Sequence, residues 1–142
     1  MSKLGGDMFD SSSNQPRAQA EIEVTPSEGM ENSFVLISRL ASGEKVGHCT
    51  MTWNEFRHMY ALTNLVVDPK YQRGSSQNIK PDEYHGFGSQ LLEAAKKFLI
   101  ERKAKGYLIN TIEDRNKVGM YEKYGWQQDE DNPKLFFFDG AA

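Results

Sequence analysis

The period of the hydrophobic pattern changes near the middle of this chain, and that change limits the folds open to it. Up to Val67, four short apolar-rich segments are separated by turn residues, and the first of them alternates apolar and charged residues, which is typical of β-strands. Beyond Gly88 apolar residues recur every three or four positions, which predicts an amphipathic helix that Gly106 ends. The four predicted strands span residues 20–24, 33–40, 45–53 and 60–67.

The remaining quarter of the chain predicts a strand over 107–112, a helix over 115–124 and a last strand over 135–138. Strands that follow one another and then alternate with helices predict an α+β fold, with helices flanking a mixed, mostly antiparallel central sheet. The whole chain has 142 residues, enough for one domain, which we place at 20–142. Residues 1–19 are polar and rich in turn formers, so we expect a disordered N-terminal tail.

Composition removes several functional classes. A formal net charge of −3 argues against a broad basic surface for nucleic acid. No apolar run approaches the ~20 residues of a membrane-spanning helix. Cys49 is the single cysteine, so we expect a cytoplasmic protein without an internal disulfide. The three histidines share no ligand spacing, and we predict no metal.

The junction between the fourth strand and the helix carries a pattern suited to phosphate. Glycines 86 and 88 stand where the helix begins, and the first turn of a helix has unpaired N–H groups and a partial positive charge. Arg73 adds a guanidinium that matches phosphate oxygens. The alternative is a tight turn with close helix packing, because glycine motifs alone are weak signals.

Two stretches resemble a known family. Val-Val-Asp-Pro-Lys-Tyr-Gln-Arg-Gly at 66–74, followed by Gly-Phe-Gly-Ser-Gln-Leu-Leu at 86–92, resembles the acetyl-CoA loop of the GNAT superfamily of N-acetyltransferases. Residues 114–126 resemble the later helix of that family, in which a tyrosine is followed four residues on by glycine and an aromatic residue. The resemblance covers about residues 33–138.

The resemblance implies an N-acetyltransferase that moves an acetyl group from acetyl-CoA to a primary amine by direct attack. The fourth strand would hold the cofactor's arm through the backbone of Leu65, Val66 and Val67, with their side chains in the core and the Leu65 N–H facing the thioester oxygen. Tyr121 would be the general acid that protonates the departing thiolate. The other implied cofactor-binding residues are Gln72, Arg73, Gly74, Gly86, Phe87, Gly88, Ser89 and Asp114.

The sequence leaves the rest of the site open. Glu55, His58 and Thr63 are the candidates for the general base, whereas Cys49 has no paired base for a covalent route. Because the connection after the first strand is short, we expect the acceptor site to be open, or to be completed by another subunit or by the insertion at 75–85. The insertion at 75–85 is either a passive loop or a lid.

The function keeps an alternative too. An inactive domain of this fold could bind a protein partner or sense CoA without chemistry. The sequence does not identify the acceptor, which is a small molecule or a protein. It does not fix the oligomeric state either, and a homodimer is one possibility.

Overall fold

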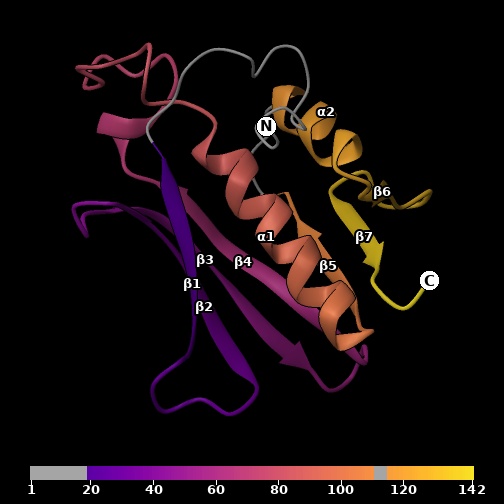
Figure 1. Cartoon of the computed structure of the whole chain (residues 1–142). Coiled ribbons are helices and arrows are strands. Elements are labelled where there is room, and N and C mark those ends of the chain that lie inside the picture. Colours follow the sequence, from indigo (N-terminus) through magenta and orange to yellow (C-terminus); the bar gives the residue numbers. More distant parts are fainter. Residues whose placement is uncertain (1–18, 111–114) are drawn as a thin grey trace.

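The computed structural model describes residues 19–110 and 115–142. Within them, seven strands form one sheet in the order β1-β2-β3-β4-β5-β7-β6, antiparallel throughout except for the parallel pair β4–β5 (Figure 1). This confirms the predicted mixed α+β fold. Apart from Gln19, the predicted tail lies outside the described residues. The elements are β1 (Ala20–Pro26), β2 (Ser33–Leu40), β3 (Lys45–Asn54), β4 (Met59–Val67), α1 (Phe87–Arg102), β5 (Lys105–Ile109), α2 (Arg115–Lys123), β6 (Gln127–Gln128) and β7 (Leu135–Asp139).

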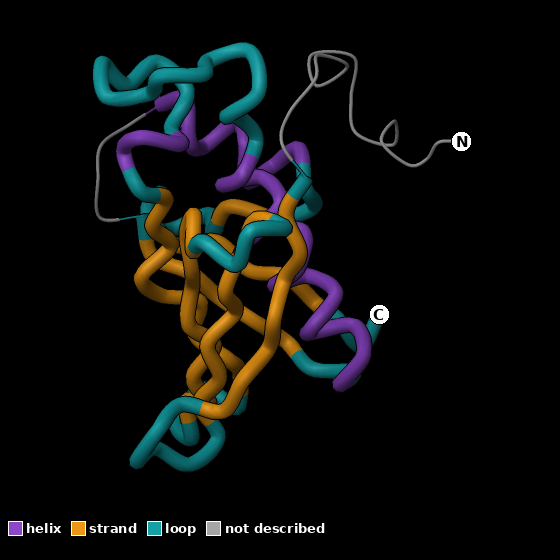
Figure 2. Tube along the Cα trace, turned by 60° about the vertical axis from the view of Figure 1, so that its left-hand side comes forward, coloured by secondary structure: helices purple, strands orange, loops and turns teal. Residues whose placement is uncertain are grey.

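Helix α1 lies along one face of the sheet and forms the main core with it (Figure 1). Its buried residues recur at helical spacing, as the sequence predicts, and all but Phe87 belong to one cluster with Leu36, Met51 and Leu62 of β2, β3 and β4. The buried residues of α1 are Phe87, Leu91, Leu92, Ala95, Phe98 and Leu99. Figure 2 shows α1 along one side of the strands, with the loop between β4 and α1 projecting beyond the end of the sheet. No helix in the described part of the chain is long and apolar enough to cross a membrane.

A single glutamine joins the edge strand to the helix. Gln90 of α1 accepts a hydrogen bond from Ser38 Oγ (3.2 Å) and donates one to the Ala20 carbonyl (2.7 Å). Ser38 is buried, so this hydroxyl needs a partner, and the glutamine supplies it while fixing β1. The start of α1 is thereby held against the first two strands.

Four local features differ from the sequence-based expectation. β5 begins at Lys105 and ends at Ile109, whereas the predicted strand spans 107–112, of which 111–112 lie outside the described residues. Helix α1 ends at Lys103, which takes a left-handed conformation (φ 51°), and Gly106 lies inside β5 instead. A Cβ on Gly106 would stand 2.5 Å from Leu99 Cδ1, so this glycine serves close packing of α1 on β5. A short 3-10 helix at Pro69–Tyr71 and the two-residue strand β6 carry too little periodic pattern to be predicted.

Two glycines should respond in opposite ways to alanine. A Cβ on Gly140 would stand 2.5 Å from the Ala104 carbonyl oxygen and 2.6 Å from that of Leu99, and neither can move freely. Gly119 lies in α2, and a Cβ added there would have no neighbouring atom within 4 Å. We expect Gly140→Ala to lower the free energy of unfolding by about 1–3 kcal/mol and Gly119→Ala to raise it by about 0.5–1 kcal/mol. Urea denaturation measures both, and equal effects would contradict the packing at Gly140.

His48 should make stability depend on pH. It lies on β3 between Ile37 of β2 and Val66 of β4, and burial, with a smaller effect from Lys45, lowers its pKa below the ordinary 6.5. The folded state therefore binds the proton less readily than the unfolded chain. Its contribution to stability is present above about pH 6.5 and lost as the pH falls through the folded pKa.

Melting curves of the wild type and His48→Gln between pH 8 and pH 5, values bracketing that ordinary pKa of about 6.5, test this. The wild type should lose more stability than the variant on acidification. Parallel curves would show that His48 does not carry the effect.

Candidate active site

The parallel strands β4 and β5 pair over only part of their length. Their register joins Tyr60 with Gly106, Ala61 with Tyr107 and Leu62 with Leu108, and then stops. β4 continues to Val67 and β5 to Ile109, so the two strands separate beyond the last pair. The separated part of β4 consequently has no strand of the described chain on its β5 side, and its backbone groups there can bind an extended ligand.

A β-bulge in β4 accompanies this separation. Thr63 pairs with Thr50 and Val66 pairs with His48, so Asn64 and Leu65 together stand opposite Cys49. Asn64 takes the left-handed conformation (φ 54°), which asparagine tolerates better than most residues. A bulge bends its strand and increases the local twist, which directs the end of β4 away from β5.

The separation opens a cavity of about 480 Å³. This volume lies in the range typical of small-molecule sites. Both strands and one side chain from α2 form its walls. The lining residues are Ala61, Leu62, Thr63, Asn64, Leu65, Tyr107, Leu108, Ile109, Asn110 and Tyr121.

Tyr121, the residue that the sequence proposes as general acid, borders this cavity. Its side chain is buried and its ring lies 5.1 Å from that of Phe136 on β7. The carbonyl of Tyr121 accepts a hydrogen bond from the Trp126 N–H (3.0 Å), which fixes the end of α2. The ring is thus held in one place at the wall of the cleft.

The start of α1 lies beside the end of β4. Gly86 caps the helix in a left-handed conformation (φ 80°) without a side-chain cap. A Cβ on Gly88 would meet Val67 Cγ2 at 3.9 Å, an ordinary contact distance. Close packing against the described residues therefore does not require glycine at position 88.

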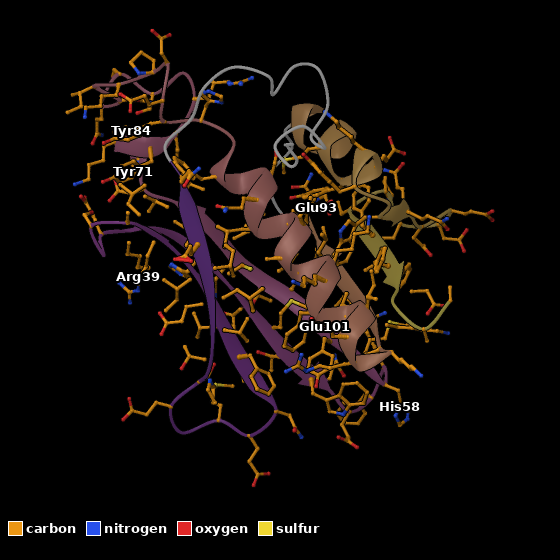
Figure 3. All side chains as sticks on the ribbon, viewed as in Figure 1. Arg39, His58, Tyr71, Tyr84, Glu93 and Glu101 are labelled. Atoms are coloured by element: carbon orange, nitrogen blue, oxygen red, sulfur yellow. The ribbon has the colours of Figure 1, made fainter. Side chains whose placement is uncertain are left out.

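The insertion does not separate the two halves of the glycine motif. Asn78 Nδ2 donates to the carbonyl of Gln72 (3.0 Å) and to that of Tyr84 (2.8 Å), so the loop begins and ends at one point. Figure 3 shows Tyr71 and Tyr84 side by side there, with ring centroids 4.6 Å apart. Arg73 Nη2 lies 3.4 Å from His85 Nδ1, the residue before Gly86. The guanidinium is thereby near the helix start.

Two predicted cofactor-binding residues differ in detail from expectation. Val66 is 49% exposed, so its side chain is not core, because it points to the face opposite α1 while Leu65 and Val67 pack inward. The ring of Phe87 is buried with Val46 and Tyr71, which leaves only its backbone for a ligand. Gln72 donates from Nε2 to the Val67 carbonyl (2.7 Å). Asp114 lies outside the described residues.

Of the three candidates for the base, the structure brings one to the cavity. Thr63 lines it. Glu55 lies in the turn between β3 and β4, where it accepts a hydrogen bond from Trp53 Nε1 (2.9 Å). His58 is in the same turn, and Figure 3 places it at the end of the sheet opposite Tyr71. The lining residues Tyr107 and Asn110 were missed because no motif marks them.

Cys49 is poorly suited to nucleophilic chemistry. Its side chain is fully buried in β3, and burial raises the pKa of its thiol to about 12. Because the thiolate is the reactive form, almost none is present near pH 7. In residues 19–110 and 115–142, no group of three His, Cys, Asp or Glu side chains could hold a metal ion.

Iodoacetamide should distinguish the buried thiol from a reactive one. We expect native protein to resist alkylation at Cys49 while protein in denaturant reacts completely, because unfolding restores an ordinary thiol pKa. Intact-mass spectrometry measures the extent over time. Rapid alkylation without denaturant would contradict the burial of Cys49.

Solved structures of acyl-CoA N-acyltransferases share this arrangement of the sheet. A protein of Klebsiella pneumoniae assigned as an acyl-CoA N-acyltransferase superposes with a TM-score of 0.54 at 20% identity, over 75% of this chain and 70% of that chain. No protein-family model matches the sequence, and no curated protein matches it. The superposition nevertheless shows that the chain has the GNAT fold.

Particular structures of the same fold come from Vibrio cholerae. Its spermidine N-acetyltransferase SpeG in complex with CoA and spermine superposes with a TM-score of 0.58 at 13% identity, over 78% of this chain and 68% of that chain. A chimera of that enzyme with hSSAT gives a TM-score of 0.59 at 14% identity, over 78% of this chain and 69% of the chimera. At such identities the likeness establishes the fold.

Proposed function

We propose that this protein is an N-acetyltransferase that moves an acetyl group from acetyl-CoA to a primary amine. One observation carries the proposal: the cleft between the separated strands β4 and β5 has Tyr121 on its wall, and the glycine-led start of α1 lies beside the end of β4. A cleft with free strand backbone suits an extended arm, and the adjoining helix start suits a diphosphate. A ligand with both parts fits the site as a whole.

The donor is held by backbone groups more than by side chains. The arm lies along Leu65, Val66 and Val67 as an added strand would, through their N–H and carbonyl groups. The diphosphate lies at the start of α1, where first-turn amides and the Arg73 guanidinium favour negative charge. The proposed set around it is Gln72, Arg73, Gly74, Gly86, Phe87, Gly88 and Ser89, with Asp114 as a further cofactor contact.

The reaction is a direct attack on the thioester. The lone pair of the neutral amine forms a C–N bond to the carbonyl carbon, and the Leu65 N–H stabilises the negative oxygen that develops. The C–S bond then breaks, and Tyr121 O–H gives its proton to the thiolate. The new amide nitrogen loses a proton to water, from which Tyr121 regains its own. Thr63 is the lining hydroxyl that can pass that proton to water.

The acceptor enters from the face of the sheet opposite α1. Thr63 and Ile109 border the cavity on that face and are exposed, Ile109 by 51%. Only six residues, 27–32, join β1 to β2, so this connection is too short to cover it. Polyamines are the first acceptors to assay, because SpeG of the same fold acts on spermidine.

Exchange of Tyr121 for phenylalanine should separate binding from chemistry. Phenylalanine keeps the ring packing against Phe136, so the fold and the rise in melting temperature caused by acetyl-CoA should persist. Loss of the acid should lower kcat by about 10²–10⁴-fold, measured as CoA released with a panel of amines. Tyr124→Phe is the matched control, since Tyr124 is buried in the same core without lining the cavity.

Three outcomes would contradict the proposal. Absence of a melting shift at millimolar acetyl-CoA argues against donor binding. A shift with unchanged kinetics in Tyr121→Phe points to another acid. Binding of a protein partner that survives Arg73→Ala and Gly88→Trp, with no CoA released, supports an inactive interaction domain instead.

A further inference from the structure

One arginine stands on the acceptor side of the cleft. The Arg57 guanidinium lies over the ring of Tyr107, 4.9 Å from its centroid, and Tyr107 lines the cavity. Leu108 packs into the core on the α1 face, so its neighbour Tyr107 points to the opposite face, from which the acceptor enters. Within residues 19–110 and 115–142, Arg57 forms no ion pair.

The turn that carries Arg57 is fixed by local hydrogen bonds. Asn54 Oδ1 accepts a hydrogen bond from the Arg57 N–H (3.2 Å), and Asn54 Nδ2 donates one to the Tyr107 hydroxyl (2.8 Å). One side chain therefore holds both the turn and the ring that the guanidinium covers. Glu55, the acid of this turn, accepts instead from Trp53 Nε1 (2.9 Å). The charge of Arg57 is thus placed beside the cleft and is not neutralised by its neighbour.

The remaining charges of this face suit a polycation poorly. The described residues that line the cavity include no Asp, Glu, Lys or Arg. Glu23 of β1 pairs with Arg39 of β2 (3.1 Å), and β3 separates both strands from β4. Asp139 of β7 stands opposite Lys105 of β5 in the register. The described lining therefore supplies no carboxylate for a polyamine, and the cation beside it repels one.

We infer that the acceptor is an amine that also carries a carboxylate, and that Arg57 binds this carboxylate. A guanidinium presents two parallel N–H donors, which match the two oxygens of a carboxylate. An acceptor of this class is attracted to the charge that a polyamine would meet as repulsion. The inference rests on the proposed function and names the substrate class of the same site.

The two charged ends of the site lie apart. The cavity extends along the strands from the pair of Ala61 and Tyr107 toward Leu65. The start of α1 lies beside the end of β4, beyond Leu65, whereas Arg57 lies at the Tyr107 end. The diphosphate and the carboxylate are therefore kept away from each other, with the amine between them at the thioester. The transfer is that of the proposed function, and the carboxylate takes no part in it.

Matched carboxylates and amides test this inference. The probes are glycine, β-alanine, γ-aminobutyrate and ε-aminocaproate, each compared with the amide of its own carboxyl group, and CoA release is measured. We expect the wild type to show a KM about tenfold lower for the carboxylate than for the amide at the chain length that spans the site. Arg57→Gln should remove this difference by raising the KM for the carboxylate, with kcat little changed. Arg57→Lys should retain part of it, because lysine keeps the charge without the fork.

Arg102→Gln is the matched control. Arg102 also covers aromatic rings, 3.7 Å from the centroid of Phe98 and 5.0 Å from that of Phe34, but on the α1 face. Its exchange should change neither KM. Each carboxylate is compared with its amide in the same variant, so any loss of folded protein that follows removal of the contact with Tyr107 cancels from the ratio.

The outcomes separate this inference from the proposed function. Amides or spermidine acetylated as efficiently as the carboxylates by the wild type overturn the inference and leave acetyl transfer standing. A carboxylate preference that persists in Arg57→Gln assigns recognition to another cation and also overturns it. No CoA release with either series or with spermidine overturns both.

Discussion

The bulge at Asn64 and Leu65 is the constraint on which the site depends. A regular β4 would stay paired with β5 beyond Leu62, and the sheet would close without a cleft. Two residues opposite Cys49 turn the strand instead, at the cost of a left-handed asparagine. Free backbone, a cavity and access to Tyr121 all follow from that one extra residue.

The second half of the site depends on how the chain returns from β4 to α1. The intervening loop is long, yet Asn78 and the edge-to-face contact between the rings of Tyr71 and Tyr84 bring its two ends together. Arg73 consequently lies next to the helix that it is proposed to assist. Favourable charge at a helix start acts only over the first turn, so this closure matters for anion binding.

Sequence patterns predicted much of this structure, and their failures have physical causes. Alternation and helical period gave the order of strands and helices because most segments bury one face. The end of α1 was missed because Lys103 took the left-handed position that glycine usually occupies. The glycines and Tyr121 were found through their spacing, whereas Asn110 reaches the cavity only through tertiary geometry. The cleft itself arises from pairing register, which a single sequence does not display.

The closed insertion also has a consequence for how the chain tolerates change in length. A loop whose ends are held together by Asn78 can be shortened or lengthened with little effect on what flanks it, because added residues cost only a slowly growing closure entropy. Peptides or reporter groups can therefore be inserted into this loop. A fluorophore attached to this loop would lie close to the start of α1 without contacting the main core.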